Sequence, residues 1–336
     1  PETTTSFETG LDVWLFDNKF NFDITYYNST LRNQFLYVST ANGESKPVNT
    51  GKIRNYGLEF SAGYRWNINH DWRWQTGFNF AWNDNRILET YKTESGVPYI
   101  VEMGTNAFKI KYIEGGRYGD IYVNSFARDE NGHIKINGAG DYENAVPVME
   151  SGKYETYVGN TTSPVTLGWN NTFSWKNFNL YFLIDGRIGG KVMSLTEPDL
   201  DLFGLSERSA HDRLKGERVT QNGKEYVLKE LPDGSGNKVP VENYYTTIGA
   251  YPMEDHVYNA TNLRMRDISL SYNFSNLLGK NTGLTAQFSI KNAFFIYKDS
   301  PIDPDISVSA ANGYSGIDCY SLPTTRSYAL TLKFNF

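Results

Sequence analysis

The final ten residues, SYALTLKFNF, alternate between apolar and polar side chains without a break. The apolar positions share one parity and are Tyr328, Leu330, Leu332, Phe334 and Phe336. Successive side chains of a β-strand point to opposite faces, so a period of two predicts a strand with one apolar face. Because the pattern holds up to Phe336, we expect that face to meet apolar surroundings along its whole length.

Eight further segments alternate in the same way. Together with the last one they are 7–16, 20–28, 54–66, 71–83, 164–175, 178–184, 264–274, 284–296 and 327–336. Most approach the roughly ten residues that a tilted strand needs to cross a bilayer, whereas strands of soluble sandwiches usually have about five or six. The opposite parity carries charges that suit a water-filled interior, namely Glu59, Arg65, Arg73, Asp185 and Lys291. The pattern therefore favours an antiparallel transmembrane β-barrel over a soluble β-sandwich.

The connections between these segments alternate in length. Short ones cover 17–19, 67–70, 176–177 and 275–283, and long ones cover about 29–53, 84–163, 193–258 and 297–325. In an antiparallel meander each kind lies at one rim, and short periplasmic turns opposite long extracellular loops are typical of outer-membrane barrels. Aromatic residues crowd the short-turn end, where such rings prefer the membrane interface. They are Trp66, Trp72, Trp74, Trp175, Phe178, Tyr272 and Phe274.

Composition narrows the remaining classes. The mean hydropathy is −0.51 and no apolar run reaches 18 residues, which excludes a transmembrane helix but not alternating strands. A net charge of −6 without a basic run argues against a nucleic-acid partner. Cys319 is the single cysteine, so no intrachain disulfide forms, and the four histidines are too scattered for a metal site. An odd count of nine strands cannot close a bacterial barrel, so we expect the missing strands upstream of Pro1.

Several stretches carry a family resemblance. One strand has the pattern Asn-x-Gly-x-Glu, in NYGLEFSAGY, and another has the pattern Leu-Arg-x-Arg, in YNATNLRMRDISLSYNF. A long hairpin is formed by VGNTTSPVTLGWNNTFSWKNFNLYFLIDGRIGGKV. SIKNAFFIYKDSPIDPD is similar to an Asn-Leu-Phe strand followed by an Asp-Pro-Glu loop. In series these motifs resemble the SusC/RagA-type TonB-dependent transporters over nearly the whole chain. Two positions depart from the family pattern, since Asp305 replaces the usual Glu and Leu322 precedes Pro323.

The resemblance implies a 22-stranded barrel plugged by an N-terminal domain. This chain, 1–336, would form the C-terminal part of that barrel, about nine strands, without the plug and the first strands. It implies import of oligosaccharides across the outer membrane of a Gram-negative bacterium, with oligopeptides as the alternative. The implied partners are a SusD-like surface lipoprotein, in an assembly that could be dimeric, and the TonB complex, which acts through the plug. Phe336 resembles the C-terminal aromatic signal for barrel assembly.

The long connections supply the candidate substrate-binding residues. Sugars need aromatic faces beside polar groups, and the connections offer Tyr154, Tyr157, Asp199, Asp201, Tyr244, Tyr245, Tyr251, Asp255, His256 and Tyr258. The alternative is that these residues only stabilise surface loops. No catalytic cluster is legible and no cofactor is implied, so an enzyme or an adhesin barrel is the weaker hypothesis. RDENGHIKING lacks the closing glutamate of a calcium loop, and its Asn131-Gly132 step predicts a turn instead.

Two further features of the connections predict structure. Residues 198–216 predict a helical insert, and its apolar side chains, Leu200, Phe203, Leu205 and Leu214, are expected to pack on neighbouring loops. Arg264 and Arg266 lie at the end of a strand after a long connection, and we expect them to form salt bridges with the lumen or the plug rather than to contact substrate.

Overall fold

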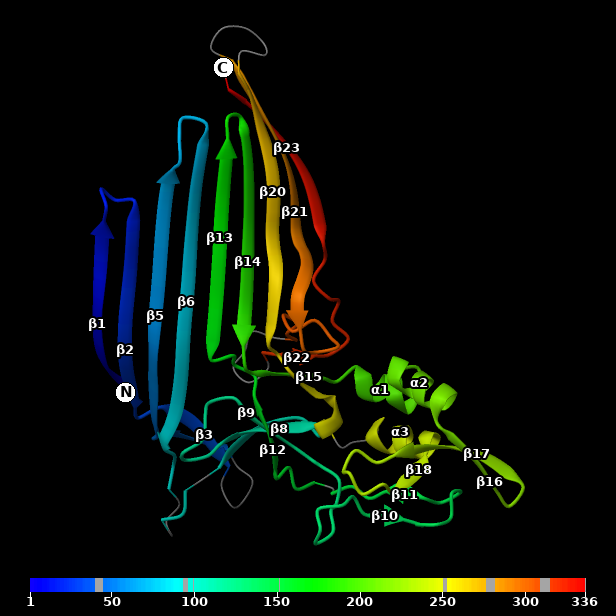
Figure 1. Cartoon of the computed structure of the whole chain (residues 1–336). Coiled ribbons are helices and arrows are strands. Elements are labelled where there is room, and N and C mark those ends of the chain that lie inside the picture. The colour runs from blue at the N-terminus through cyan, green and yellow to red at the C-terminus, as the bar shows by residue number, and fades with distance from the viewer. Residues whose placement is uncertain are drawn as a thin grey trace.

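One antiparallel sheet of nine long strands dominates the part of the chain that the structure describes (Figure 1). The structure is a computed structural model and describes residues 1–39, 45–92, 96–98, 100–150, 152–249, 253–275, 282–308 and 315–335. The strands are β1 (Thr3–Leu15), β2 (Phe20–Arg32), β5 (Lys52–Asn67), β6 (Trp72–Glu89), β13 (Val165–Trp175), β14 (Phe178–Ile188), β20 (Asn262–Ser275), β21 (Gly283–Lys298) and β23 (Ser327–Asn335). Each pairs with the next in that order, and β1 and β23 are not neighbours. The nine predicted strands are confirmed, and the sheet is an unclosed portion of a barrel wall.

In the register of the sheet, the apolar positions of successive strands lie opposite one another. One continuous row of paired residues is Trp66, Trp74, Phe173, Leu180, Leu270, Phe288 and Leu330. A row of the other parity is Asp23, Ser61, Asn79, Gly168 and Asp185. One face of the sheet is therefore apolar and the other polar, as a wall between lipid and water requires.

Aromatic rings gather at the short-turn rim, as predicted. Trp72 and Trp175 stack with ring centroids 5.6 Å apart, and Phe178 lies 5.9 Å from Trp175 and 4.5 Å from Tyr272. Aromatic rings that contact one another along a rim form the girdle of a membrane interface.

The two rims of the sheet differ as the connection lengths predict (Figure 1). Turns 16–19, 68–71 and 176–177 join strands at one rim, and the long connections 33–51, 90–164, 189–261 and 299–326 lie at the other. The long connections hold their own elements: β3 (Phe35–Ser39), β4 (Ser45–Asn49), β7 (Val101–Gly104), β8 (Phe108–Tyr112), β9 (Asp120–Val123), β10 (Ile136–Asn137), β11 (Val146–Pro147), β12 (Thr156–Asn160), β15 (Lys191–Ser194), α1 (Glu197–Leu202), α2 (Glu207–Lys215), β16 (Glu217–Gln221), β17 (Lys224–Glu230), β18 (Lys238–Pro240), α3 (Val241–Gly249), the 3₁₀ turn η1 (Met253–His256), β19 (Val257–Asn259) and β22 (Ile317–Asp318). No helix among the described residues is long and apolar enough to cross a membrane.

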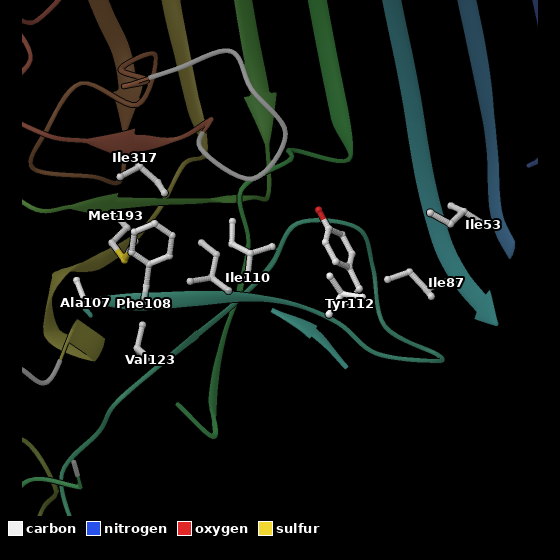
Figure 2. Close-up of a cluster of buried hydrophobic side chains, with 11 residues drawn as sticks. Ile53, Ile87, Ala107, Phe108, Ile110, Tyr112, Val123, Met193 and Ile317 are labelled. Carbon is white, nitrogen blue, oxygen red and sulfur yellow. The ribbon is translucent and has the colours of Figure 1, made fainter. Parts of the chain in front are cut away.

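A first core joins the long connections to the wall. Figure 2 shows Tyr112 between Ile110 and Ile87, with Ile53 beside them. Ile53 and Ile87 are paired across β5 and β6, and Ile53 shares the parity of Glu59. The polar face of the wall thus becomes apolar near this rim, where the sheet β12-β9-β8-β7 covers it. Met193 and Ile317 bring two further connections into the same core (Figure 2).

A second core, here called the loop lobe, joins the connections 90–164 and 189–261. Its buried residues are Phe126, Ile134, Ala145, Leu231, Val239, Val241, Tyr244, Tyr245 and Ile248. The lobe includes α3, the pair β10–β11 and the sheet β16-β17-β18. The Asn131-Gly132 step lies in a turn that the Asp129 carboxylate closes by accepting from the backbone amides of Asn131 and His133, both at 2.9 Å.

A bulge in β20 aims two arginines at one carboxylate. Arg266 has no paired residue on β21, although its neighbours form the pairs Met265–Phe294 and Asp267–Lys291. A bulge of this kind redirects a side chain. Arg264 lies 3.0 Å and Arg266 2.8 Å from the Asp305 carboxylate. Arg264 also binds Asp303 at 2.9 Å, which confirms the predicted salt bridges at this strand end. Burial disfavours the charge of Asp303, yet hydrogen bonds from Thr324 and the Asp305 amide and the nearby Arg264 charge lower its pKa.

Candidate ligand-binding site

The candidate site is built on the helical insert of the connection 189–261. The insert is confirmed as α1 and α2. α2 begins after Ser206, whose Oγ accepts from the Ser209 amide at 3.1 Å and caps the helix. Ser194 precedes α1, and its Oγ accepts from the Glu197 amide at 3.0 Å. Both helices pack against α3, and Asp201 of α1 and Ser209 of α2 are buried.

A buried ionic centre joins α1, α2 and η1. Asp201 accepts from the Ser206 hydroxyl at 2.6 Å and forms an ion pair with the Arg208 guanidinium. His256 is fully buried, and its Nε2 lies 2.8 Å from an Asp201 oxygen. The same Nε2 lies 2.7 Å from the Arg208 guanidinium, so it contacts both an acceptor that favours the Nε2–H tautomer and a donor that favours a bare Nε2. Burial disfavours the Asp201 charge, but hydrogen bonds from His256, Arg208 and Ser206 outweigh it and lower the pKa of Asp201.

Three tyrosines surround this centre, and each gives its hydroxyl to a carboxylate. Tyr245 donates to Asp212 at 2.7 Å, Tyr244 donates to Asp255, and Tyr258 donates to Glu197. Burial first, and then the neighbouring carboxylates, raise the pKa of all three phenols. The hydroxyls therefore stay protonated at all physiological pH values, and their positions are fixed.

A pocket of about 500 Å³ opens between α2 on one side and α3, β17 and β19 on the other. Its lining residues are Glu197, Ser206, Glu207, Arg208, His211, Asp212, Lys229, Tyr244, Tyr245, Tyr258 and Pro301. The Lys229 ammonium lies 5.0 Å from the Tyr244 ring centre and 2.6 Å from Asp212. Such a wall offers ring edges, fixed acceptors and two cations, a mixture that suits a hydroxyl-rich or charged ligand rather than an apolar one.

The structure brings together part of the predicted set. Tyr244, Tyr245 and Tyr258 line the pocket, and Asp201, Asp255 and His256 lie directly behind it. Two other predicted tyrosines lie away from the pocket: Tyr157 on β12 and Tyr154 just before it. Tyr154 donates to the Asn106 carbonyl at 2.7 Å, and the exposed Tyr157 donates to Asp120 at 3.3 Å.

Three predicted residues lie outside this arrangement. Asp199 lies on α1 but does not line the pocket. Tyr251 and Phe336 fall outside the described residues.

The prediction for the apolar residues of the insert is wrong. Phe203, Leu205 and Leu214 are 73%, 72% and 76% exposed, and Leu200 is partly exposed. The reason is that polar contacts anchor the insert, since Asp201, Ser206 and Ser209 are its buried side chains apart from Pro198, and the four leucine and phenylalanine side chains point outward. Together with Leu202, the residues Leu200, Phe203, Leu205 and Leu214 form what we call the insert patch.

The sequence alone did not single out Arg208, Asp212, Lys229 or Glu197. They come from α1, α2 and β17, and only the packing of these elements brings them to one pocket. The one local signal is the i, i+4 spacing of Arg208 and Asp212, which places both on one face of a helix.

Comparison with known proteins agrees with the fold. Residues 1–185 match the family model described as "TonB dependent receptor-like, beta-barrel". The whole chain is 24% identical over 361 residues to TonB-dependent receptor P3 of Formosa agariphila and 24% identical over 351 residues to TonB-dependent receptor SusC of Bacteroides thetaiotaomicron. It covers 34% and 32% of those proteins, so it spans about a third of their length. Among solved structures, that of the RagAB peptide transporter matches 98% of this chain and 35% of that chain, with a TM-score of 0.69 and 18% identity.

Proposed function

The chain belongs to the family of TonB-dependent receptor-like β-barrels, and from this premise we propose that the whole protein imports oligosaccharides across the outer membrane in a TonB-dependent manner. Proteins of this family lie in the outer membrane, and the nine strands are part of such a barrel wall. The missing strands, a plug and the contact with the TonB complex would lie outside the present chain. The long connections would then be extracellular and face the substrate.

The observation that carries the substrate class is the pocket behind α2. Pyranose rings present apolar faces and hydroxylated rims, so they bind where ring surfaces adjoin fixed donors and acceptors. Tyr258 and Tyr245 supply ring surface, and Arg208 and Asp212 supply polar groups that neighbouring residues already hold in place. Fixed groups lose little conformational entropy on binding, which favours affinity.

Oligopeptides are the second candidate. Two cations and several carboxylates line the same pocket, and they could pair with the charged groups of a peptide. The fold similarity to RagAB, which is named a peptide transporter, motivates including this class in the test.

A SusD-like surface lipoprotein is the proposed partner. The name SusC of one relative motivates this proposal. The insert patch supports it, because a group of exposed large apolar side chains is typical of a contact surface. We expect the charge-introducing change Leu214→Glu to weaken association with the lipoprotein in a pull-down of the full-length complex. The matched control is Leu322→Glu, which changes a leucine on another connection that is 89% exposed, against 76% for Leu214. Equal loss in both variants would contradict the patch assignment.

Binding of defined ligands to the full-length protein tests the substrate proposal. The wild type is titrated calorimetrically with neutral oligosaccharides and with oligopeptides of similar length. Tyr258→Phe and Arg208→Gln should each weaken oligosaccharide binding roughly tenfold, because the first frees the Glu197 acceptor that the Tyr258 hydroxyl holds in place and the second removes a fixed polar group. Tyr157→Phe, on β12, is the control and should have no effect. Binding of peptides alone would replace the oligosaccharide proposal, and an effect of Tyr157→Phe alone would move the site to β12.

A further inference from the structure

A second pocket, of about 520 Å³, lies at the long-connection rim of the wall. It forms where the last strand separates from its neighbour. β21 extends to Lys298, but its pairing with β23 ends at Lys291–Ser327. The connection 299–326 fills part of the space beside the unpaired end of β21, and the pocket remains between them.

The level of this pocket in the membrane follows from the strand itself. On β21, Leu284 pairs with Phe274 in the aromatic girdle of the short-turn rim. Phe294, ten residues further on, is separated from Leu284 by about the length of strand that crosses the hydrocarbon layer. Phe294 and Tyr297 are 53% and 52% exposed, as expected for rings at the second interface. The next residue, Lys298, therefore lies at the level of the lipid headgroups.

Two cations line this pocket without a carboxylate partner among the described residues. Lys298 donates to the Pro301 carbonyl at 2.9 Å and lies 5.5 Å from the Phe295 ring. Arg326 is exposed, and no described residue forms a hydrogen bond or ion pair with its guanidinium. Arg326 lies two residues before Tyr328 and so continues the outward parity of β23.

The carboxylates of the same pocket are already bound. Asp303 accepts from Arg264 at 2.9 Å and from Thr324. Asp318 accepts from Ser194 at 2.9 Å and from the Ser321 amide at 3.3 Å. Arg264 is likewise satisfied, since it binds Asp303 and Asp305. The lining side chains therefore carry a net charge of +1, because Arg264, Lys298 and Arg326 outnumber Asp303 and Asp318.

We propose that this pocket binds the phosphate-bearing headgroup of an outer-leaflet lipid. A guanidinium matches a phosphate with two parallel hydrogen bonds, and an ammonium adds a point charge. The acyl chains would run along the exposed outward side chains Phe294, Tyr328 and Leu330. We choose a lipid rather than a free anion because Arg326 has the outward parity of β23 and adjoins this lipid-facing surface, whereas Lys298 follows the outward Tyr297 and closes the pocket from the other face. The site is independent of the transported substrate, and it would fix the height of the last strands in the outer leaflet.

Lipid binding to the full-length protein tests this proposal. The protein is purified in detergent and titrated with lipid A, and the bound lipid is counted by native mass spectrometry. Arg326→Gln and Lys298→Gln should each weaken binding roughly fivefold, and the double variant about 25-fold, because a basic side chain at a membrane surface contributes about that factor. Lys333→Gln is the matched control, since Lys333 lies on β23 with the opposite parity and near the other rim.

Each outcome decides the question. Unchanged lipid A binding by the double variant would overturn the proposal, provided that its thermal unfolding matches that of the wild type. Binding of inorganic phosphate as tightly as lipid A would also overturn it, because the lipid part of the ligand would then contribute nothing. Oligosaccharide binding should be the same in all variants, so failure here is distinct from failure of the proposed transport function.

Discussion

Replacing Arg264 should release the connection 299–326 from the wall without unfolding the sheet. Arg264 is only 2% exposed, and its guanidinium binds Asp303 at 2.9 Å, Asp305 at 3.0 Å and the Thr324 hydroxyl at 2.9 Å. Its guanidinium carbon also lies 3.8 Å from the centre of the Phe295 ring. In Arg264→Gln, the buried Asp303 loses its ion-pair partner and Asp305 loses one of its arginine partners.

The magnitude follows from what remains after the change. Breaking a buried ion pair on one side costs about 3–5 kcal/mol. Asp305 keeps Arg266 at 2.8 Å and Asp303 keeps its contacts with Thr324, so the lower end applies. A loss of about 3 kcal/mol in the local opening free energy corresponds to a roughly 150-fold faster exchange of the protected amides.

Hydrogen exchange of the full-length protein in detergent measures this effect. The reporters are the Thr324 amide, which donates to Asp303 at 3.1 Å, and the Val308 amide, which donates to the Ile317 carbonyl at 2.8 Å. The control is Arg187→Gln, because Arg187 is 48% exposed and reaches Asp305 only at 3.6 Å. An exposed pair of this kind contributes at most about 1 kcal/mol, or roughly fivefold. If the two variants exchange equally, the assignment of Arg264 as the anchor of this connection is refuted.

Three further predictions concern the wall and the insert. Leu270→Arg, on the lipid-facing row, should destabilise the barrel by about 2–4 kcal/mol in urea unfolding from vesicles. Ser271→Arg, on the opposite face, should destabilise it much less, and equal losses would contradict the assignment of Leu270 to the lipid-facing side. Gly57→Ala should cost about 1–3 kcal/mol in the same assay because a Cβ would lie 2.5 Å from the Trp82 carbonyl oxygen, while Gly168→Ala, which has open space, should be nearly neutral. The pKa of Asp201 is lowered in the folded state, so its stabilisation of α1 and α2 is present above the ordinary carboxyl value of about 4 and is lost as the pH falls below it; proteolysis of the insert should rise there in the wild type, and Asp201→Asn should show sensitivity that is independent of pH.

The nine long strands could be predicted because their signal is local. Alternation with a period of two is visible in each segment by itself, and the predicted 284–296 differs from β21 by one residue at its start and two at its end. The largest difference at a strand start is in β1, which begins at Thr3 rather than at residue 7. Residues Thr3 to Ser6 are all polar and carry no alternation, and pairing with β2 alone makes them a strand.

The long connections could not be predicted to the same depth. β7, β8, β9 and β12 have four or five residues each, too few for a periodic pattern to stand out. Their core includes Met193 and Ile317, which lie far away in the sequence. The same limit applies to the candidate site. Tyrosine content pointed to Tyr244, Tyr245 and Tyr258, but the pairing of Arg208 with Asp201 depends on how two short helices pack, and that packing buries polar rather than apolar side chains.

The shared cores have a consequence for how such a protein can change its specificity. Each of the two cores draws buried side chains from more than one long connection. A connection therefore cannot be lengthened, shortened or transplanted from a relative as an independent cassette, because the others would lose part of their hydrophobic support. Divergence and engineering alike should proceed through point changes at the pocket surfaces, or through exchange of the connections 90–164 and 189–261 as one unit.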